Sequence, residues 1–425
     1  MANLFYSLTY QHTMKYQSFE TPRCKIFVDM QETTRISKEK CIYCKGRFLC
    51  GLPECPIFEQ VKIQSSVELT DHFFGPSPSV FVGWRTYPRV YAGPLSLPFE
   101  PKDALVYDNP KQWYGYDFPR IVDLRSSLVR SKEKVNVNAP LGEIQLLALA
   151  KTPPDIEVTL KKKPTFTIVF SAIAQPMGPS GIIKDLKIAD NISAEKSVEY
   201  VTSDEINARD AVNTLYSSGI DVYTLTRLMS AGLLGLKKKM VPTRWSITTV
   251  DNIIGGNLIE KIREFPLLDN YIVFSNTYLG NHFEVLVLPQ PWEYEQLEAW
   301  VPNTFWTIGM KETKIIGEHE TYYGRSDYAI REGGGYYAAR LACLELLNKL
   351  KRQGAVLVLR ETTPDYFLCV GVWECRENIR NAVKVGEFST LNEALDNISS
   401  RLHIPIEEWR EKSVMLSQTK LDQWI

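Results

Sequence analysis

Four cysteines lie close together near the start of the chain, in the stretch CIYCKGRFLCGLPEC. Cys41 and Cys44 form a Cys-x-x-Cys pair, and Cys50 and Cys55 follow within the same short segment. Two thiolates on one tight turn can bind a metal ion, and two more complete a tetrahedral site with no open position for water. The motif therefore predicts a structural zinc ion, with an iron–sulfur cluster as the alternative that the irregular spacing also permits.

Arginines set among aromatic residues form a second group of candidates. They occur in the stretches GWRTYPRVYAGP, IVDLRSS, PTRWS and GRSDYAIREGGG. Guanidinium groups bind phosphate through paired hydrogen bonds, and aromatic rings stack on bases, so the combination predicts a surface for DNA or a nucleotide. The candidate residues are Arg85, Tyr87, Arg89, Arg125, Arg244, Arg325 and Arg331.

His282 and Glu284, in the stretch NHFEVLVLP, are candidates for catalysis, as is Asp123. Side chains two residues apart on a strand face the same side, so this pair could act as acid and base or form a plain hydrogen bond. A surface histidine beside a solvated glutamate is the simpler alternative, because a single histidine is weak evidence. A nucleotide pocket would be built from Arg85, Arg244, His282, Glu284 and Arg325.

Three consecutive glycines, Gly333, Gly334 and Gly335, precede a predicted helix. The first N–H groups of a helix have no partner within it and can bind phosphate. The segment lacks the Lys-Ser/Thr pair of a P-loop, so it is not a Walker motif. Phosphate binding and a plain capping loop both stay open for these glycines.

The chain ends on a tryptophan and an isoleucine after a polar stretch. Gln418, Leu421, Trp424 and Ile425 follow the pattern Q-x-x-aliphatic-x-x-aromatic-apolar. In one 3₁₀ turn, Leu421 and Trp424 fall on the same face and form a hydrophobic plug. This pattern resembles the peptide motif that docks on the sliding clamp (PCNA), so we expect a flexible tail that becomes ordered on the clamp. A tail that buries Trp424 in its own core is the alternative.

These motifs together resemble the archaeal Nre family of DNA repair proteins over essentially the whole chain. The densest stretches are CIYCKGRFLCGLPECP, VFVGWRTYPRVYAGP, LGNHFEVLVLP and GGGYYAARLACLELL, and VPTRWSITTVD lies between them. Ile425 departs from the aromatic or Trp-Leu endings that are frequent in archaeal members. The resemblance implies DNA repair recruited by the clamp in an archaeon, but it implies no reaction. An enzyme acting on a nucleotide or on nucleotide-modified DNA, and a non-catalytic repair scaffold, are the alternatives.

The helices and strands that the sequence predicts around these residues indicate a mixed α+β fold. The expected parts are a zinc knuckle region (1–60), a central α+β domain (61–290), a smaller α/β domain (291–403) and a tail (404–425). Residues 270–289 predict a hairpin around a turn at Leu279, Gly280 and Asn281. Capping boxes are expected at 202–205 and 390–393, and strands in AVLVLRE and YFLCVGVWE.

Composition limits the function classes. With 425 residues, 44% hydrophobic and 23% charged residues, the chain is an ordinary globular protein, and its net charge of −1 means that any DNA contact must be local. The apolar run at 166–174 is too short to cross a bilayer. The start of the chain shows no signal peptide, and five of the eight cysteines precede residue 56, so we expect a reducing, cytoplasmic location.

Overall fold

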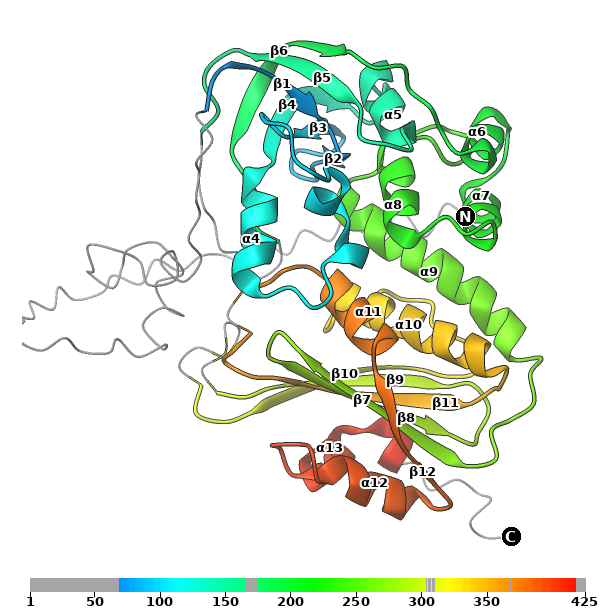
Figure 1. Ribbon diagram of the computed structural model, residues 1–425. Coiled ribbons are helices and arrows are strands. Elements are labelled where there is room, and N and C mark those ends of the chain that lie inside the picture. The colour runs from blue at the N-terminus through cyan, green and yellow to red at the C-terminus, as the bar shows by residue number, and fades with distance from the viewer. Residues whose placement is uncertain are drawn as a thin grey trace, which may run out of the picture. The chain divides into compact units, whose positions relative to one another are not determined.

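The computed structural model describes residues 69–165, 175–302, 304, 307, 310–366 and 368–417. Within these ranges the chain forms eleven α-helices and two six-stranded mixed sheets (Figure 1), which confirms the mixed α+β fold. The four clustered cysteines and the last eight residues lie outside the described ranges. None of the helices described is long and apolar enough to cross a membrane.

The first sheet has the strand order β1-β5-β6-β4-β3-β2. Neighbouring strands are antiparallel except β6 and β4, which are parallel. The strands are β1 (His72–Pro76), β2 (Ser79–Val82), β3 (Arg89–Ser96), β4 (Val129–Asn136), β5 (Asp155–Leu160) and β6 (Ser180–Ile188).

Helices and two 3₁₀ turns accompany this sheet. They are η2 (Leu105–Asp108), η3 (Pro110–Gln112), α4 (Phe118–Ser127), α5 (Gly142–Leu149), α6 (Lys196–Ser203), α7 (Ala208–Ser217), α8 (Val222–Ser230) and α9 (Thr243–Ile262). The capping box expected at 202–205 is wrong. Thr202 lies inside α6, where its hydroxyl donates to the Val198 carbonyl, and Asn207 caps α7 instead by accepting from the Asp210 N–H.

The second sheet has the strand order β10-β9-β11-β8-β7-β12, with only β9 and β11 parallel. Its strands are β7 (Tyr271–Tyr278), β8 (Asn281–Leu288), β9 (Tyr294–Trp300), β10 (Lys314–Glu320), β11 (Ala355–Thr362) and β12 (Val383–Phe388). The predicted β7–β8 hairpin is confirmed. Leu279 and Gly280 have φ angles of 49° and 73°, as a tight hairpin turn requires, and a Cβ on Gly280 would lie 2.4 Å from the Tyr366 nitrogen.

Helices cover both faces of the second sheet (Figure 1). Phe283, Val285 and Val287 of β8 share a core with α9 and with α10 (Gly334–Leu350). Leu286 and Leu288 point the other way, into a core with the C-terminal helices. Burial on both faces explains why the second half of β8, Val285–Leu288, is a continuous apolar run. The remaining helices are α11 (Trp373–Arg380), α12 (Leu391–Ser399), α13 (Ile406–Lys412) and α14 (Val414–Ser417).

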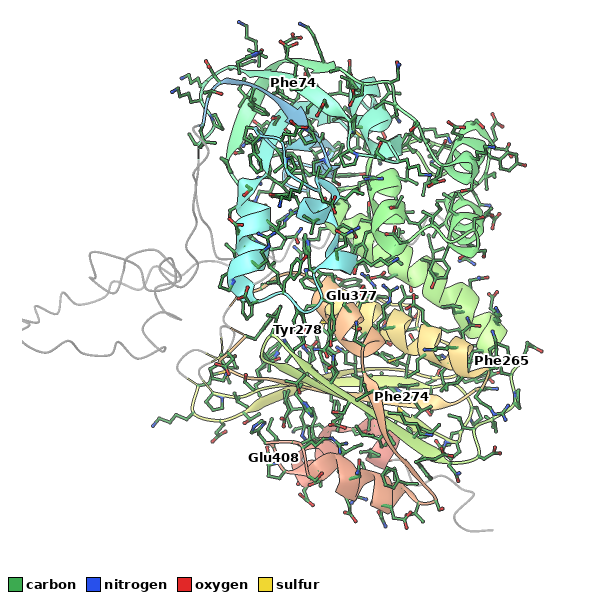
Figure 2. All side chains as sticks on the ribbon, in the orientation of Figure 1. Phe74, Phe265, Phe274, Tyr278, Glu377 and Glu408 are labelled. Atoms are coloured by element: carbon green, nitrogen blue, oxygen red, sulfur yellow. The ribbon has the colours of Figure 1, made fainter. Side chains whose placement is uncertain are left out.

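Polar contacts join the part of the chain that carries the first sheet to β7 and α11. Tyr278 donates its hydroxyl proton to the carbonyls of Trp113 (2.9 Å) and Tyr116 (2.6 Å), and Glu377 on α11 accepts from the Tyr223 hydroxyl at 2.7 Å (Figure 2). Residue 290, the expected boundary between two domains, lies between β8 and β9 of one sheet. The second sheet therefore takes strands from both sides of that boundary.

Candidate functional site

A cluster of cations and aromatic rings lies where the β2–β3 turn meets the start of α9. The guanidinium carbons of Arg85 and Arg244 each lie 5.8 Å from the centre of the Trp84 ring. The Tyr87 ring is 5.1 Å from the Trp245 ring. We call this cluster the Trp84 surface, and it consists of Trp84, Arg85, Tyr87, Lys239, Arg244 and Trp245.

Local structure fixes this surface. The Val82 N–H donates to the Thr243 hydroxyl at 3.0 Å, which ties the end of β2 to the first residue of α9. Arg89 closes the turn through its backbone, because its N–H donates to the Thr86 carbonyl at 3.0 Å and its carbonyl accepts from the Thr86 hydroxyl. These hydrogen bonds hold the β2–β3 turn against the start of α9, so the side chains of both segments lie side by side.

The Trp84 surface is positively charged and open to solvent. Trp84 is 43% exposed and Tyr87 is 39% exposed. Lys239 places its Nζ 5.2 Å from the centre of the Tyr87 ring. Among the described residues, none of the three cations of this surface forms an ion pair. Cations over aromatic faces with no competing carboxylate can bind phosphate oxygens and stack on bases at the same place.

Two of the predicted arginines lie elsewhere, beside β10. Arg325 forms an ion pair with Glu318 at 3.0 Å, and the Arg331 N–H donates to the other oxygen of that carboxylate at 2.8 Å. The Arg331 guanidinium donates to the Gly317 carbonyl at 3.4 Å. Arg85 and Arg244 thus share the Trp84 ring, whereas Arg325 has a separate set of partners.

Arg125 and Asp123 sit on α4 and differ in burial. Arg125 is 5% exposed, forms an ion pair with Asp108 and lies 5.8 Å from the centre of the Trp113 ring. A guanidinium held in this way is not available to a phosphate. Asp123 forms a pair with Arg120 at 3.4 Å near the surface, and burial raises its pKa.

The three glycines Gly333–Gly335 begin α10, and close packing explains them. Gly333 has a φ of 60°, a conformation that favours glycine. A Cβ on Gly334 would lie 3.1 Å from Val372, and one on Gly335 would lie 3.4 Å from a Glu298 carboxylate oxygen. Burial and the nearby carboxylates also raise the pKa of Glu332, which precedes these glycines. Close packing and the φ of Gly333 thus account for these glycines without a bound phosphate.

His282 and Glu284 form a hydrogen bond, but in the interior. His282 Nε2 lies 2.8 Å from a Glu284 carboxylate oxygen, and the Thr277 hydroxyl lies 2.6 Å from Nδ1. Arg401, which follows α12, donates twice to the Glu284 carboxylate at 2.7 Å. Burial would raise the pKa of Glu284, but hydrogen bonds from Arg401, His282 and Ser275 outweigh burial and lower it. The arrangement ties the chain after α12 to the second sheet.

Removing Arg401 tests that structural role. Arg401→Ala is expected to lower the free energy of unfolding by about 2 kcal/mol at neutral pH, because a buried carboxylate loses its main donor. The lowered pKa of Glu284 stabilises the native protein above the ordinary glutamate pKa, and this contribution is lost as pH falls through the lowered value. The difference between wild type and variant should therefore narrow on acidification. Urea unfolding of both proteins at a series of pH values measures this difference in stability. A difference that is the same at every pH would contradict the role assigned to Glu284.

The sequence did not single out three members of the Trp84 surface, namely Trp84, Lys239 and Trp245. The available signal was the aromatic residue next to each arginine, in GWR and RWS. The part of the chain described here contains no group of three or more His, Cys, Asp or Glu side chains arranged to hold a metal ion. Cys41, Cys44, Cys50 and Cys55 lie outside that part, so the zinc prediction stays a prediction.

Comparison with known proteins identifies the class. The family described as "Archaeal Nre, N-terminal" matches residues 49–307, and "Archaeal Nre, C-terminal" matches residues 320–424. The chain therefore belongs to the archaeal Nre family. No significant match to a solved structure was found.

Three characterised relatives cover nearly the whole chain. The DNA repair protein NreB of Archaeoglobus fulgidus is 36% identical over 383 residues, which is 89% of this chain and 97% of that protein. The DNA repair protein NreA of the same organism is 36% identical over 90% of this chain and 97% of its own length. The DNA repair protein NreA of Haloferax volcanii is 32% identical over 85% of this chain and 90% of its own length.

Proposed function

We propose that this protein acts in DNA repair and contacts DNA through the Trp84 surface. The role in DNA repair is supported by the three relatives, which are named DNA repair proteins. The contact is supported by one observation above the others, which is that Arg85 of the β2–β3 turn and Arg244 at the start of α9 both lie over the exposed Trp84 ring. The overall charge of −1 makes such a local cluster necessary for binding a polyanion.

The aromatic rings favour unpaired DNA over a regular duplex. Bases in a duplex are stacked on each other, so protein rings can reach them only where strands are separated, damaged or ended. Cations alone would bind the phosphates of both forms. The presence of exposed Trp84 and Tyr87 beside the cations therefore predicts tighter binding to single-stranded DNA or to unpaired regions.

Substitution of the rings and of the cations should separate the contribution of base stacking from the contribution of phosphate binding. Trp84→Ala and Tyr87→Ala are each expected to weaken binding of a labelled single-stranded oligonucleotide by about 1–3 kcal/mol. Arg244→Gln should weaken binding to single strand and duplex alike, and should reduce the slope of log affinity against log salt by about one. Fluorescence anisotropy over a salt series measures both effects.

Arg209→Gln is the matched control, because Arg209 is an exposed arginine on α7 outside the Trp84 surface. It should leave the affinity and the salt dependence unchanged. If Trp84→Ala and Arg244→Gln behave like this control, DNA does not bind at the Trp84 surface. A scaffold that brings other repair factors to the clamp would then be the better description.

We also propose recruitment by the sliding clamp through Gln418, Leu421, Trp424 and Ile425, and a structural zinc ion held by Cys41, Cys44, Cys50 and Cys55. Both rest on the sequence patterns, since these residues lie outside the described ranges. Metal analysis of the purified protein is expected to find about one zinc per chain, because four thiolates complete one tetrahedral ion. If the purified protein is brown and contains iron, the four cysteines hold an iron–sulfur cluster instead of zinc.

A further inference from the structure

Strand β10 forms one edge of the second sheet. It pairs with β9 on one side, and no described strand pairs with it on the other. The Gly317 carbonyl points outward, where the Arg331 guanidinium donates to it at 3.4 Å. Alternate residues of an antiparallel strand direct their backbone groups to the same side, so Ile315 and His319 also present theirs to the open side. An open edge of this kind can accept a further strand.

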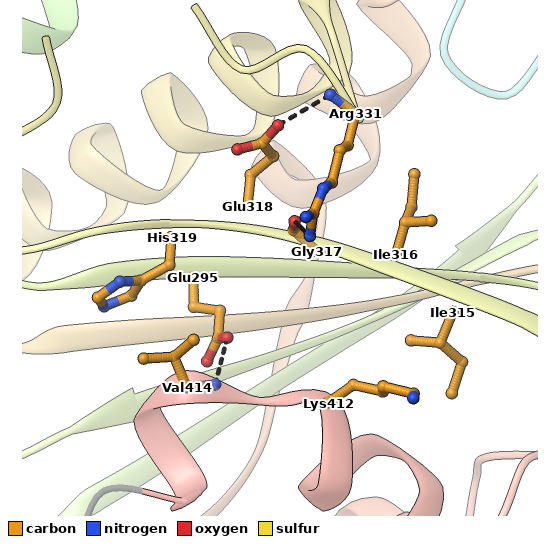
Figure 3. A pocket seen from close by; sticks show the side chains of 9 residues that line it. All are labelled: Glu295, Ile315, Ile316, Gly317, Glu318, His319, Arg331, Lys412 and Val414. Carbon is orange, nitrogen blue, oxygen red and sulfur yellow. Dashed lines mark hydrogen bonds between the residues drawn. The ribbon is translucent and has the colours of Figure 1, made fainter. Parts of the chain in front are cut away.

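A cleft of about 410 Å³ runs along this edge (Figure 3). Ile315 packs toward the core that contains α12 and α13, and Ile316 points to the opposite face. Val414, at the start of α14, borders the cleft on the Ile315 side (Figure 3). The edge therefore offers an apolar contact on each face as well as its unpaired backbone.

Two exposed cations beside the cleft have no carboxylate partner among the described residues. Lys412 at the end of α13 and Arg331 before α10 are both exposed, and neither forms an ion pair within the described residues. The two carboxylates that line the cleft are already occupied. Glu318 accepts from Arg325 and from the Arg331 N–H, and Glu295 accepts from the Ser413 hydroxyl and the Val414 N–H, each at 2.6 Å. Each face of the open edge thus has one exposed cation that forms no ion pair among the described residues, although the Arg331 guanidinium also donates to the Gly317 carbonyl.

We propose that β10 binds an extended, acidic segment of a partner protein as an added strand. The backbone of such a segment would pair with the outward groups of Ile315, Gly317 and His319, and it would displace the Arg331 guanidinium from the Gly317 carbonyl. Successive side chains of a strand point to opposite faces, so apolar residues would meet Ile315 and Ile316, and acidic residues would reach Lys412 on one face and Arg331 on the other. This inference does not depend on DNA binding at the Trp84 surface.

Cations beside an edge strand can also serve only to prevent unwanted pairing. The two roles differ in what they predict for an acidic strand, which binds to the edge if the cations belong to a docking site and does not bind if they only block pairing. The experiment uses the full-length protein and a panel of short labelled peptides that alternate glutamate or aspartate with valine or isoleucine. Peptides with lysine in place of the acidic residues are the charge control, and a proline-substituted version cannot pair as a strand.

Fluorescence anisotropy should show binding of the acidic peptides and not of the other two kinds. Hydrogen exchange should slow at 315–319 when an acidic peptide binds. Lys412→Gln and Arg331→Gln, both exposed and outside the buried core, should each weaken binding, and the double variant should weaken it about tenfold or more. Lys349→Gln, which replaces an exposed lysine on α10, should have no effect.

Three results would overturn the proposal. The first is that no acidic peptide of the panel binds, or that one binds without slowing exchange in β10. The second is protection of β10 that rises with protein concentration in the absence of peptide, which would assign the edge to a second copy of this chain. The third is equal protection of β10 by an oligonucleotide, which would assign the two cations to nucleic acid.

Discussion

Replacing Asp251 with alanine is expected to lower the free energy of unfolding by about 3–5 kcal/mol. Asp251 on α9 and Arg376 on α11 form an ion pair in which the guanidinium donates to both carboxylate oxygens. The side chains are 1% and 2% exposed. Removing the carboxylate leaves a buried guanidinium with no counter-charge, and solvation of that group is lost without compensation. Because the pair joins α9 to α11, the loss should loosen the contact between the helices and the second sheet.

Denaturant unfolding of three variants measures this effect and its cause. Lys384→Ala, which breaks the exposed Lys384–Glu387 pair, should have little effect on the free energy of unfolding. Combining Asp251→Leu with Arg376→Met replaces both charges by apolar groups and should recover most of the lost stability. An Asp251→Ala variant no less stable than Lys384→Ala would contradict the argument. A double variant as unstable as the single one would attribute the loss to packing rather than to the unpaired charge.

Local sequence signals predicted the elements that are stabilised by contacts between residues close together in the sequence. The β7–β8 turn is marked by Leu279-Gly280, and the capping box at the start of α12 is formed by Thr390 and Glu393 as expected. The strand expected in YFLCVGVWE is wrong. Tyr366, Leu368, Val370 and Trp373 pack instead in a cluster with Trp113 and α4, and Trp373 begins α11. Their apolar character was visible, but the partner that decides their conformation lies far away in the sequence.

The same limit applies to the candidate site. Arg85 and Arg244 were predicted together because each stands beside an aromatic residue, and the structure places both over Trp84. Arg325 also lies close to tyrosines in the sequence, Tyr323 and Tyr328, yet it forms an ion pair with Glu318. The sequence shows which groups could bind a phosphate. Only the packing of strands and helices decides which of them are left without a carboxylate partner.

Trp424→Ala is expected to lower the affinity for the sliding clamp by about 2 kcal/mol or more and so to abolish most of the binding, because buried aromatic anchors dominate small interfaces. The affinity of the intact protein should be moderate, on the order of micromolar, since a short peptide loses conformational entropy when it docks. Leu421→Ala should act in the same direction, because both residues fall on the face that would fill the clamp's pocket. Thr419→Ala, between these positions and the rim residue Gln418, is the matched control and should bind normally.

Truncation after Ser417 distinguishes docking from a role in the core. The described chain up to that residue is anchored by its own contacts, since Glu295 accepts from the N–H groups of Val414 and Met415 and Trp409 is fully buried. The truncated protein should therefore keep its melting temperature and lose clamp binding in a pull-down with purified clamp. Clamp binding that survives truncation would refute the docking motif. A large fall in melting temperature would show instead that Trp424 packs in the protein's own core.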